Sequence, residues 1–286
     1  MDQRILDLYE EYKHHSVDRR EFLRRLSVLA GGAAAAATLL PLLERSHAMA
    51  EIVPKDDPRL SAERIKYSGA TGEVVAYFAR PKGGEKLPGV VVISEIYGLA
   101  PHIEDVTRRI ALEGFLAMAP DALTPLGGTP EDLQKARALT LTLDGQSTLQ
   151  NYVAAIKYLK TNPSSTGKVG VVGFCWGGGM ANKVAVNSSD VQAVVPYYGP
   201  QPAIEDVPKI KAPLLLHYAG LDEPIDKGIP AYEGALKKAS VDFKIYMYEG
   251  AQHGFNNDAN PERYNKKAAD LAWQRTIAFL KEKLKK

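Results

Sequence analysis

The sequence predicts an α/β fold in which helices cover both faces of a mostly parallel central sheet. Short apolar runs, rich in β-branched and aromatic residues, alternate along the chain with longer segments of helical periodicity. Most of these runs lack strict polar alternation, which is typical of strands that are buried on both faces. In such a sheet ligands bind at the carboxyl ends of the strands, so functional residues are expected in the loops that follow them.

The predicted elements fill the chain after residue 70. Strands are expected at 73–80, 89–95, 114–120, 168–174, 193–199, 212–220 and 243–250. Helices are expected at 103–113, 130–143, 148–161, 176–186, 229–240 and 261–285. No internal repeat or low-complexity linker follows residue 50, so residues 51–286 are expected to form a single domain. The loop-like stretch 124–133 either covers a site or is an ordinary surface connection.

The first fifty residues have the order of an export signal. Arg19 and Arg20 come first, an alanine-rich apolar stretch follows over 26–43, and small residues end the segment at 48–50. This order predicts a signal peptide over residues 1–50 with cleavage after Ala50. The arginine pair, followed closely by Phe22 and Leu23, resembles a twin-arginine signal. We therefore expect a periplasmic protein that meets the twin-arginine export machinery transiently.

An uncleaved membrane helix is the alternative reading of this segment, because its apolar stretch approaches the roughly 20 residues that span a bilayer. Gly31, Gly32 and Pro41 interrupt the stretch, so no stable membrane anchor is expected. Cleavage after Ala50 would leave three histidines in the mature chain as candidate bases: His102, His217 and His253.

Composition and charge narrow the possible partners. The chain has 286 residues, of which 45% are hydrophobic and 24% charged, as in ordinary globular proteins. The net charge is +2 and no dense run of lysine and arginine occurs, so nucleic acid is not an expected partner. The single cysteine, Cys175, cannot form an internal disulfide. It is therefore a buried apolar side chain, a reactive thiol or half of an intermolecular bridge.

The surroundings of Cys175 favour the reactive thiol. The sequence Gly173-Phe174-Cys175-Trp176-Gly177 follows a predicted strand and leads into a predicted helix. This is the context of a nucleophile elbow, usually Gly-x-Ser-x-Gly, with cysteine in the place of serine. Gly173 and Gly177 would allow close packing around a sharp, strained turn. The exposed N–H groups of the helix would favour a thiolate and receive a developing oxyanion.

A nucleophile elbow predicts an acidic residue and then a histidine further along the chain. Asp222 follows the strand at 212–220, and His253 follows the strand at 243–250. His253 is the expected base, and Asp222 would hold its ring in the productive tautomer. Glu223 and Asp226 compete with Asp222 for that role.

The other two histidines of the mature chain have different expected roles. His217 lies within an apolar predicted strand and is expected to be a core residue with satisfied hydrogen bonds. His102 follows a proline near a strand end and could line the site. No spacing typical of metal ligands is present, and acyl transfer on a cysteine needs neither a metal nor an organic cofactor, so none is expected.

With these residues in view, the sequence resembles the dienelactone hydrolase family, which comprises cysteine-dependent enzymes of the α/β-hydrolase fold that open lactones and esters. The similarity spans about residues 60–283. The motifs that carry it are Gly-Phe-Cys-Trp-Gly-Gly at 173–178, Gly-Leu-Asp at 220–222, Gln-His-Gly-Phe at 252–255 and Ser-Glu-Ile-Tyr-Gly at 94–98. The resemblance implies an α/β-hydrolase fold and a small-molecule ester or lactone as substrate.

The resemblance also implies further site residues and a mechanism. Glu95 would interact with Cys175 and help to generate its thiolate. The backbone N–H groups of Ile96 and Trp176 would form an oxyanion hole. Acyl transfer to Cys175 would give a thioester, and His253 would activate the water that releases the acid.

The sequence departs from the family at two substrate-binding positions. In the dienelactone-opening members two arginines bind the substrate carboxylate, one shortly after the Pro-Asp that ends the fourth strand and one four residues after the catalytic histidine. Here residues 120–125 contain no arginine, and the second position is Asn257. Neither segment can replace a bidentate guanidinium. Arg263 is close in sequence and could compensate.

Two other function classes remain open from the sequence. One is a catalytically idle protein of the same fold whose pocket binds a small acid or ester. The other is a thiol-redox or peroxide-sensing protein that uses Cys175 alone. Because the chain has no second cysteine, a redox cycle would need an external thiol.

Overall fold

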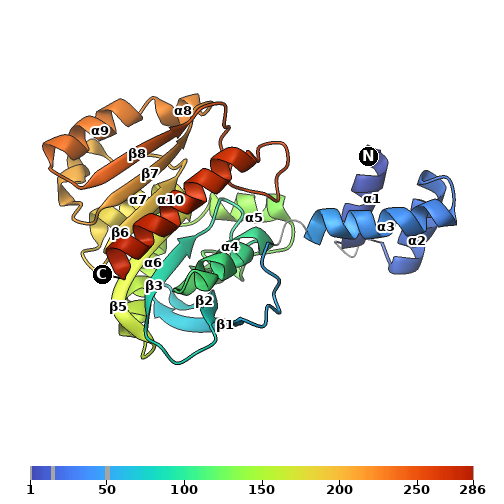
Figure 1. Ribbon diagram of the computed structural model, residues 1–286, viewed down its shortest axis with the longest axis horizontal. Coiled ribbons are helices and arrows are strands. Elements are labelled where there is room, and N and C mark those ends of the chain that lie inside the picture. Colours follow the sequence, from blue (N-terminus) through green and yellow to red (C-terminus); the bar gives the residue numbers. More distant parts are fainter. Residues whose placement is uncertain (1, 14–16, 49–51, 286) are drawn as a thin grey trace. The chain divides into compact units, whose positions relative to one another are not determined.

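The computed structural model describes residues 2–13, 17–48 and 52–285. The chain divides into two compact units, residues 1–52 and 53–286, which we describe separately (Figure 1). The larger unit is built on one mixed sheet with strand order β1-β2-β4-β3-β5-β6-β7-β8. Its strands are β1 (Leu60–Gly69), β2 (Gly72–Pro81), β3 (Leu87–Ile93), β4 (Leu116–Pro120), β5 (Ser165–Phe174), β6 (Ala193–Tyr197), β7 (Leu214–Ala219) and β8 (Phe243–Tyr248).

The sheet is parallel from β4 to β8 and antiparallel at its other edge, where β2 pairs with both β1 and β4. All seven predicted strands are present as β2 to β8, but β1 was not predicted. β1 is an edge strand in which most residues are at least partly exposed, so its sequence carries several polar residues instead of an apolar run. The predicted mostly parallel α/β architecture is confirmed, and it is that of the α/β-hydrolase fold.

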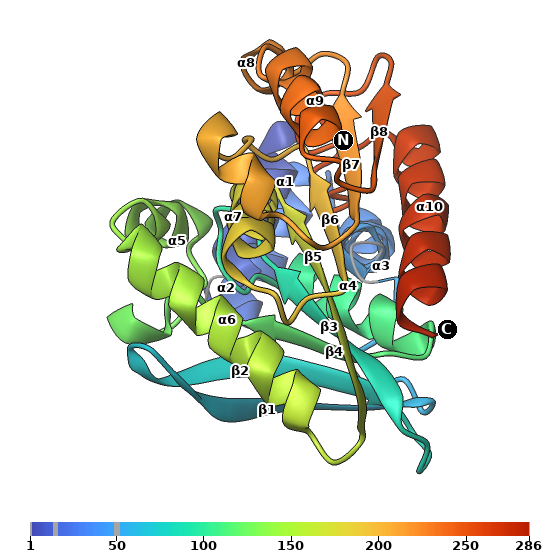
Figure 2. The same ribbon diagram turned by 90° about the vertical axis from the view of Figure 1, so that its left-hand side faces the viewer.

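Helices cover both faces of the sheet. They are α4 (Pro101–Leu112), α5 (Leu133–Thr140), α6 (Gly145–Thr161), α7 (Trp176–Asn187), the short α8 (Glu223–Asp226), α9 (Ile229–Lys238) and α10 (Lys266–Leu284). Side chains of α6, α7 and α9 share one buried cluster with the sheet, and those of α4 and α10 share the cluster on the other face. Figure 2 shows this division, with α6 and α7 on one side of the sheet and α10 on the other.

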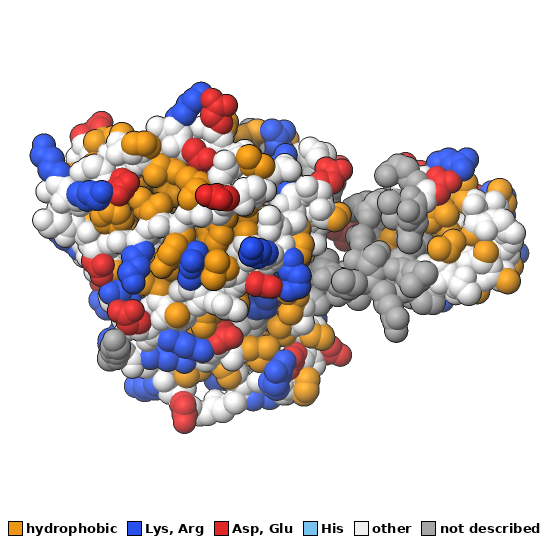
Figure 3. Space-filling model, turned by 45° about the horizontal axis from the view of Figure 1, so that its top comes forward, with side chains coloured by type: hydrophobic (Ala, Val, Ile, Leu, Met, Phe, Trp, Pro, Cys, Tyr) orange, Lys and Arg blue, Asp and Glu red, His pale blue; other side chains and the backbone are white. Residues whose placement is uncertain are grey.

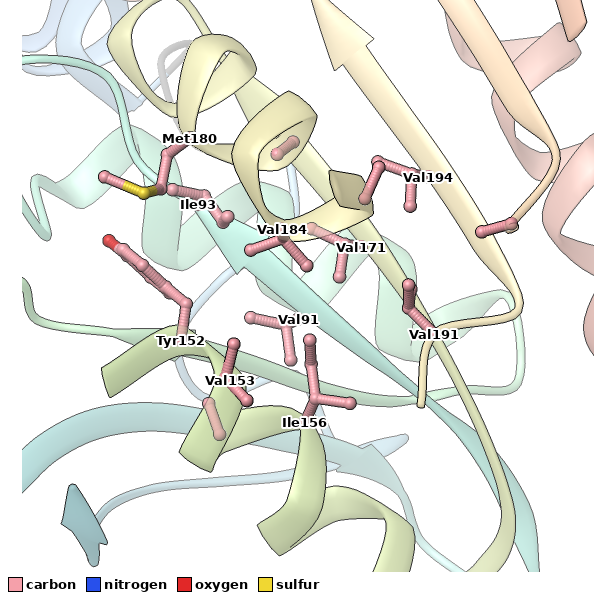
Figure 4. Close-up of a cluster of buried hydrophobic side chains, with 14 of the residues drawn as sticks. Val91, Ile93, Tyr152, Val153, Ile156, Val171, Met180, Val184, Val191 and Val194 are labelled. Carbon is pink, nitrogen blue, oxygen red and sulfur yellow. The ribbon is translucent and has the colours of Figure 1, made fainter. Parts of the chain in front are cut away.

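The central strands are apolar on both faces because both faces are covered. Val90, Val91, Val92 and Ile93 of β3 are fully buried, although successive side chains point to opposite sides. Figure 4 shows the cluster on one face, where valines of β3, β5 and β6 pack against Tyr152, Val153 and Ile156 of α6 and against Met180 and Val184 of α7. The strands lack polar alternation, the feature that predicted a parallel sheet, because helices bury both of their faces.

Several helix boundaries differ from the prediction, and at the starts of α5 and α10 a capping side chain sets the boundary. α10 begins at Lys266 instead of 261, since the side chain of Asn265 accepts a hydrogen bond from the Ala268 N–H. α5 begins at Leu133 instead of 130, because the Asp132 carboxylate accepts from the N–H groups of Gln134 and Lys135.

The stretch 124–133 is tied to the end of β4 by one buried carboxylate. Asp121 accepts hydrogen bonds from the Leu123 N–H and from both the N–H and the hydroxyl of Thr129. Between these anchor points the chain makes a short 3₁₀ turn at Thr124–Leu126. This half of the stretch is therefore a connection fixed at both ends by Asp121.

Val53, the first residue of the larger unit, is hydrogen-bonded to side chains of α4 through both its N–H and its carbonyl group. The Val53 N–H donates to Asp105 Oδ1 over 2.8 Å. The Val53 carbonyl accepts from Arg108 Nε over 2.7 Å. The side chains of Asp105 and Arg108 are fully buried, so Val53 has a fixed position at the start of the larger unit.

The smaller unit contains three helices within its described residues: α1 (Gln3–Lys13), α2 (Arg19–Leu29) and α3 (Ala33–Ala48). It has a small apolar core of its own, in which the ring of Phe22 stacks on that of Tyr12 with centroids 4.3 Å apart. The Asp18 carboxylate caps α2 by accepting from the Arg20 and Glu21 N–H groups. The predicted arginine pair therefore lies in the first turn of a helix.

Among the described residues, no single helix is long and apolar enough to span a membrane. Arg19–Leu29 and Ala33–Leu40 reach that length and composition only as a pair, which is bent by 112°. Gly31 and Gly32 lie at the bend with φ of 81° and 142°, a region that favours glycine. The predicted cleavage point after Ala50 lies outside the described residues, so the signal peptide and its export remain predictions.

The visible face of the larger unit carries both signs of charge. Figure 3 shows Lys and Arg side chains interspersed with Asp and Glu side chains across that face, with hydrophobic side chains between them. This mixture accords with the net charge of only +2.

His217 is the core residue that the sequence predicted. Its Nδ1 lies 2.8 Å from the Tyr248 hydroxyl, and its Nε2 lies 3.0 Å from Thr276 Oγ1. Burial, together with the nearby charge of Arg275, lowers the pKa of His217 to about 3. The ring is therefore neutral in the folded protein at neutral pH.

The buried ring predicts a specific loss of stability in acid. The unfolded chain takes up a proton on His217 below its ordinary pKa of 6.5, whereas the folded protein resists protonation down to about 3. The stabilising contribution is therefore present above pH 6.5 and lost as the pH falls toward 3, at up to about 1.4 kcal/mol per pH unit. In urea unfolding at a series of pH values, the His217→Gln variant should lack this part of the slope. If the free energy of unfolding depended on pH in the same way for both proteins, this prediction would be wrong.

Candidate active site

Cys175 lies in the sharp turn between β5 and α7. β5 ends at Phe174 and α7 begins at Trp176, and Cys175 between them has φ 57° and ψ −117°. A non-glycine residue rarely adopts a positive φ, so the surrounding structure must hold this turn. Part of that support is the Cys175 N–H, which donates to the carbonyl of Tyr197 in β6 over 3.0 Å. The strand, turn and helix of the predicted nucleophile elbow are present at the predicted residues.

Gly173 and Gly177 are required by close backbone contacts. A Cβ atom on Gly177 would lie 2.3 Å from the carbonyl oxygen of Ser94, and one on Gly173 would lie 2.1 Å from the carbonyl oxygen of Gly177. Neither distance is possible for a side-chain carbon. The first turn of α7 therefore packs directly against the end of β3.

This packing brings together the two segments that carry the predicted oxyanion-hole residues. Trp176 is the first residue of α7, and the N–H groups of a first helical turn have no acceptor within the helix. Ile96 follows the end of β3 by three positions. Among the described residues, neither the Ile96 nor the Trp176 N–H donates to a protein acceptor. Both groups are therefore available to a ligand.

The predicted acid and base meet Cys175 in one chain of contacts. His253 Nε2 lies 2.9 Å from Cys175 Sγ, and His253 Nδ1 lies 2.5 Å from Asp222 Oδ2. The Asp222 side chain is only 7% exposed, and that of His253 is 28% exposed. The histidine ring can therefore exchange protons with the sulfur on one side while the carboxylate fixes its other nitrogen.

The two competing carboxylates do not contact His253. Glu223 pairs with Lys227 at 2.8 Å on the exposed surface. The pKa of Asp226 is raised, because of burial and because of the nearby Asp222 charge. Of the three candidates after β7, the one that orients the imidazole is thus Asp222.

The environment of His253 favours its protonated form. Burial alone would lower the pKa of the ring. The hydrogen bonds from the ring to Asp222 and Cys175, and the charges of these two groups, outweigh burial and raise the pKa to about 10. At neutral pH the geometry therefore favours an imidazolium between two acceptors. The ring nitrogen that faces the elbow lies 2.9 Å from the Cys175 sulfur.

Glu95 is buried near this group but bonds to a different partner. Its side chain is enclosed, with 6% of the residue exposed, and its Oε2 accepts a hydrogen bond from Asn257 Nδ2 over 2.6 Å. The resemblance implied a contact between Glu95 and Cys175, whereas the hydrogen bond in the structure runs to Asn257. Asn257 occupies the position at which a substrate-binding arginine was sought, and it is a neighbour of Glu95 that sequence reasoning missed.

Tyr198 is a second residue that sequence reasoning missed. It follows β6 with a φ of 37°, and its ring packs on that of His253 with centroids 5.1 Å apart. The edge-to-face contact with Phe255, at 5.2 Å, fixes the ring from another side. Burial raises the pKa of Tyr198, and so do the charges of Glu95 and Cys175, so the phenol stays neutral. The Tyr-Tyr-Gly that ends the predicted strand at 193–199 was the available signal.

Two further candidates are placed as follows. Arg263 is exposed, and its Cδ lies 3.8 Å from the position that a Cβ of Gly254 would occupy, so its side chain runs beside the residue after His253. His102 does not bond to Cys175, Asp222 or His253; its Nδ1 lies 2.8 Å from Asp258 Oδ1.

Among the described residues, no group of three or more His, Cys, Asp or Glu side chains is arranged to hold a metal ion.

The high pKa of His253 should depend on Asp222. In an Asp222→Asn variant the carboxylate charge is lost, so the pKa of the imidazole should fall from about 10 toward its ordinary value, as measured by NMR titration of the ring. Because a raised pKa stabilises the fold below pH 6.5 and this contribution is lost as the pH rises through about 10, the wild-type protein should also lose stability in alkali more steeply than the variant.

A matched control is Glu223→Gln, which removes the neighbouring carboxylate that pairs with Lys227 on the surface. This variant should leave the His253 titration in place. An Asp222→Asn protein that titrates like the wild type would contradict the assignment of Asp222.

Comparison with known proteins gives a consistent family. The family model of dienelactone hydrolases matches residues 74–284. A protein of Saccharolobus solfataricus named as a carboxymethylenebutenolidase is 33% identical over 256 residues, which cover 77% of this chain and 98% of the relative. A relative of the same name from Synechocystis is 34% identical over 234 residues, covering 74% of this chain and 93% of its own length.

A solved structure named as a dienelactone hydrolase from Klebsiella pneumoniae agrees with these sequences. It is 27% identical to this chain, with a TM-score of 0.69. The match covers 77% of this chain and 98% of the Klebsiella chain. The match includes the strands and loops that carry Cys175, Asp222 and His253, which all lie within residues 74–284. The fold, the family model and the sequence relatives lead to one conclusion: the chain belongs to the dienelactone hydrolase family of hydrolases.

Proposed function

We propose that the protein hydrolyses a small carboxylic ester or lactone, with Cys175 as nucleophile and a thioester as intermediate. The observation that carries this proposal is the chain of contacts from Asp222 through His253 to Cys175, at 2.5 and 2.9 Å, on a nucleophile elbow. The printed names of the curated relatives, carboxymethylenebutenolidases, support the lactone or ester as substrate class.

The reaction would run in two acyl-transfer steps. The Cys175 thiolate attacks the carbonyl carbon, and the backbone N–H groups of Ile96 and Trp176 hold the resulting oxyanion. When the C–O bond breaks, the His253 imidazolium gives its proton to the leaving oxygen, which leaves a thioester and a neutral imidazole. The imidazole then takes a proton from water as that water attacks the thioester. The acid leaves and the thiolate–imidazolium pair is restored.

The raised pKa of His253, at about 10, supports this assignment of protons. The first step needs an imidazolium and a thiolate at the start, and a cation that is held on both ring nitrogens provides that state at neutral pH. Asp222 serves to stabilise the cation and orient the ring.

We further propose that the preferred substrate is neutral at the end remote from the scissile bond. The stretch 120–125 contains no arginine, and Asn257 uses its amide on Glu95 instead of on a ligand. A substrate carboxylate would therefore lack the bidentate partners that the dienelactone-opening members offer. Neutral lactones and simple esters suit this site better.

The proposal is tested by hydrolysis assays with purified mature protein and its Cys175→Ala variant. The panel contains an activated aryl acetate, a carboxylate-bearing dienelactone and several neutral lactones. Removal of the nucleophile should lower kcat/KM by roughly a thousandfold or more. The wild type should prefer a neutral member of the panel, and acid quenching during turnover of the aryl acetate should trap an acyl group on Cys175 that mass spectrometry detects.

Equal turnover by both proteins would refute Cys175 as the nucleophile. Absence of turnover by either protein, together with a melting-temperature shift on addition of a panel compound, would instead support the idle binding protein. A strong preference for the carboxylate-bearing dienelactone would refute the proposed neutral substrate and direct attention to Arg263, whose side chain runs beside Gly254.

We also propose that residues 1–50 direct the protein to the periplasm through the twin-arginine machinery and are removed after Ala50. The support is the order of the arginine pair, the apolar stretch and the small residues at 48–50. In a bacterial host that has this machinery, a doubly substituted Arg19→Lys, Arg20→Lys chain should stay in the cytoplasm at full length. The wild-type chain should reach the periplasm with Glu51 as its first residue.

The matched control for export is an Arg24→Lys, Arg25→Lys chain, which changes two arginines of the same helix outside the predicted signal pair. It should be exported like the wild type. Export of the Arg19→Lys, Arg20→Lys chain at the wild-type level, or an N-terminus other than Glu51, would contradict the respective part of the proposal.

A further inference from the structure

Three side chains of the loop between β8 and α10, residues 249–265, bind different parts of the larger unit. His253 reaches Cys175 and Asp222. Asn257 reaches Glu95. Asp258, which the proposed reaction does not use, reaches α4.

Asp258 is bound on both carboxylate oxygens. Its Oδ1 lies 2.8 Å from His102 Nδ1, and its Oδ2 accepts from Arg109 Nη2 over 2.5 Å. All three side chains are largely enclosed, with 7% of Asp258, 5% of His102 and 13% of Arg109 exposed. Burial raises the pKa of Asp258, but the hydrogen bond and charge of His102 and those of Arg109 more than offset this and lower it, so the carboxylate is ionised.

The partners of Asp258 form one face of α4. His102, Asp105 and Arg109 are spaced by three and four residues, which places them on the same side of the helix. Arg109 also binds Asp105 over 2.5 Å, and Asp105 in turn holds the Val53 N–H. Asp258 therefore docks onto a helix face whose charged groups are already fixed by one another.

This docking joins the two halves of the proposed site. α4 begins directly after the segment that carries Glu95 and Ile96, while the loop of Asp258 carries His253 and Asn257. In the part of the chain that the structure describes, the hydrogen bonds between this loop and α4 all end on Asp258. The loop's own turns are closed by local backbone bonds, such as Asn257 N–H to the Gly254 carbonyl and Asn260 N–H to the Asn257 carbonyl. These bonds hold the shape of the loop but not its position against α4.

We infer that Asp258 is a positioning residue, which holds the β8–α10 loop against α4 so that His253 meets Cys175 and Asn257 meets Glu95. It acts through these neighbours and touches neither the thiol nor the substrate carbonyl. The inference rests on the proposed cysteine hydrolase function, because that function gives the two contacts their role. A displacement of about 1 Å at reacting groups can lower the rate by roughly a hundredfold, so a carboxylate outside the reacting set can still control turnover.

The test compares Asp258→Ala and Asp258→Asn with the matched control Glu104→Gln. Like Asp258, Glu104 is a buried carboxylate with an arginine partner, since it accepts from Arg64 over 2.5 Å. Glu104 lies on α4 itself, and its pair joins α4 to β1 and not to the loop. Each variant of the mature protein is examined in three ways: the melting temperature, kcat/KM on the best ester of the panel, and the rate of Cys175 alkylation by iodoacetamide as a function of pH. The alkylation profile reports the thiolate–imidazolium pair and needs no substrate turnover.

We expect both Asp258 variants to lose roughly ten- to a hundredfold in kcat/KM and to shift the alkylation profile toward that of a free thiol. Asn keeps the shape and one acceptor oxygen, so Asp258→Asn should lose less than Asp258→Ala. Glu104→Gln should leave both kcat/KM and the alkylation profile at the wild-type values.

Asp258 variants that keep the wild-type alkylation profile would overturn the inference, whatever their melting temperatures. So would a Glu104→Gln variant that shifts the profile equally, since the effect would then be one of general stability. If Asp258→Ala does not fold, His102→Asn and Arg109→Lys each loosen one side of the docking, and a wild-type profile in both would overturn the inference. A wild-type protein without esterase activity but with an Asp258-dependent alkylation profile would refute the proposed reaction and leave the positioning role standing.

Discussion

The site depends on the contact between the first turn of α7 and the end of β3. At Gly177 there is no room for a single additional carbon, because the Ser94 carbonyl would lie 2.3 Å away. This contact packs the first turn of α7, directly after Cys175, against the segment that follows β3 and carries Ile96 two residues beyond Ser94. The position of the thiol therefore follows from backbone packing between two central strands and a helix. Side chains of the neighbouring loops only have to reach a point that the scaffold has already defined.

Charge at the site is arranged around one cation. The His253 imidazolium has Asp222 on one side and Cys175 on the other, and its ring is packed against the neutral phenol of Tyr198. The remaining carboxylate, Glu95, is kept in place by the uncharged amide of Asn257. The absence of an arginine at that position means that Glu95 is held by hydrogen bonding and not by a counter-charge.

Local patterns predicted the fold and the nucleophile elbow, because both are encoded in runs of contiguous residues. The strands β2 to β8 are apolar runs, and the elbow is a five-residue pattern at 173–177. β1 escaped prediction because an exposed edge strand has no apolar run to detect. The contacts of Glu95 with Asn257 and of His102 with Asp258 join residues 162 and 156 positions apart. No spacing rule predicts such pairs, since loop conformation alone decides which polar side chain meets which partner.

The attachment of Val53 to α4 sets a limit on how far the chain can be shortened from its start. Loss of every residue up to 52 would leave the hydrogen bonds of Val53 with Asp105 and Arg108 intact. Trimming by one residue more would take a donor from Asp105 and an acceptor from Arg108 inside a fully buried cluster, where unsatisfied groups are costly. The proposed removal of residues 1–50 would therefore leave a narrow margin. The predicted cut after Ala50 would leave only Glu51 and Ile52 ahead of Val53.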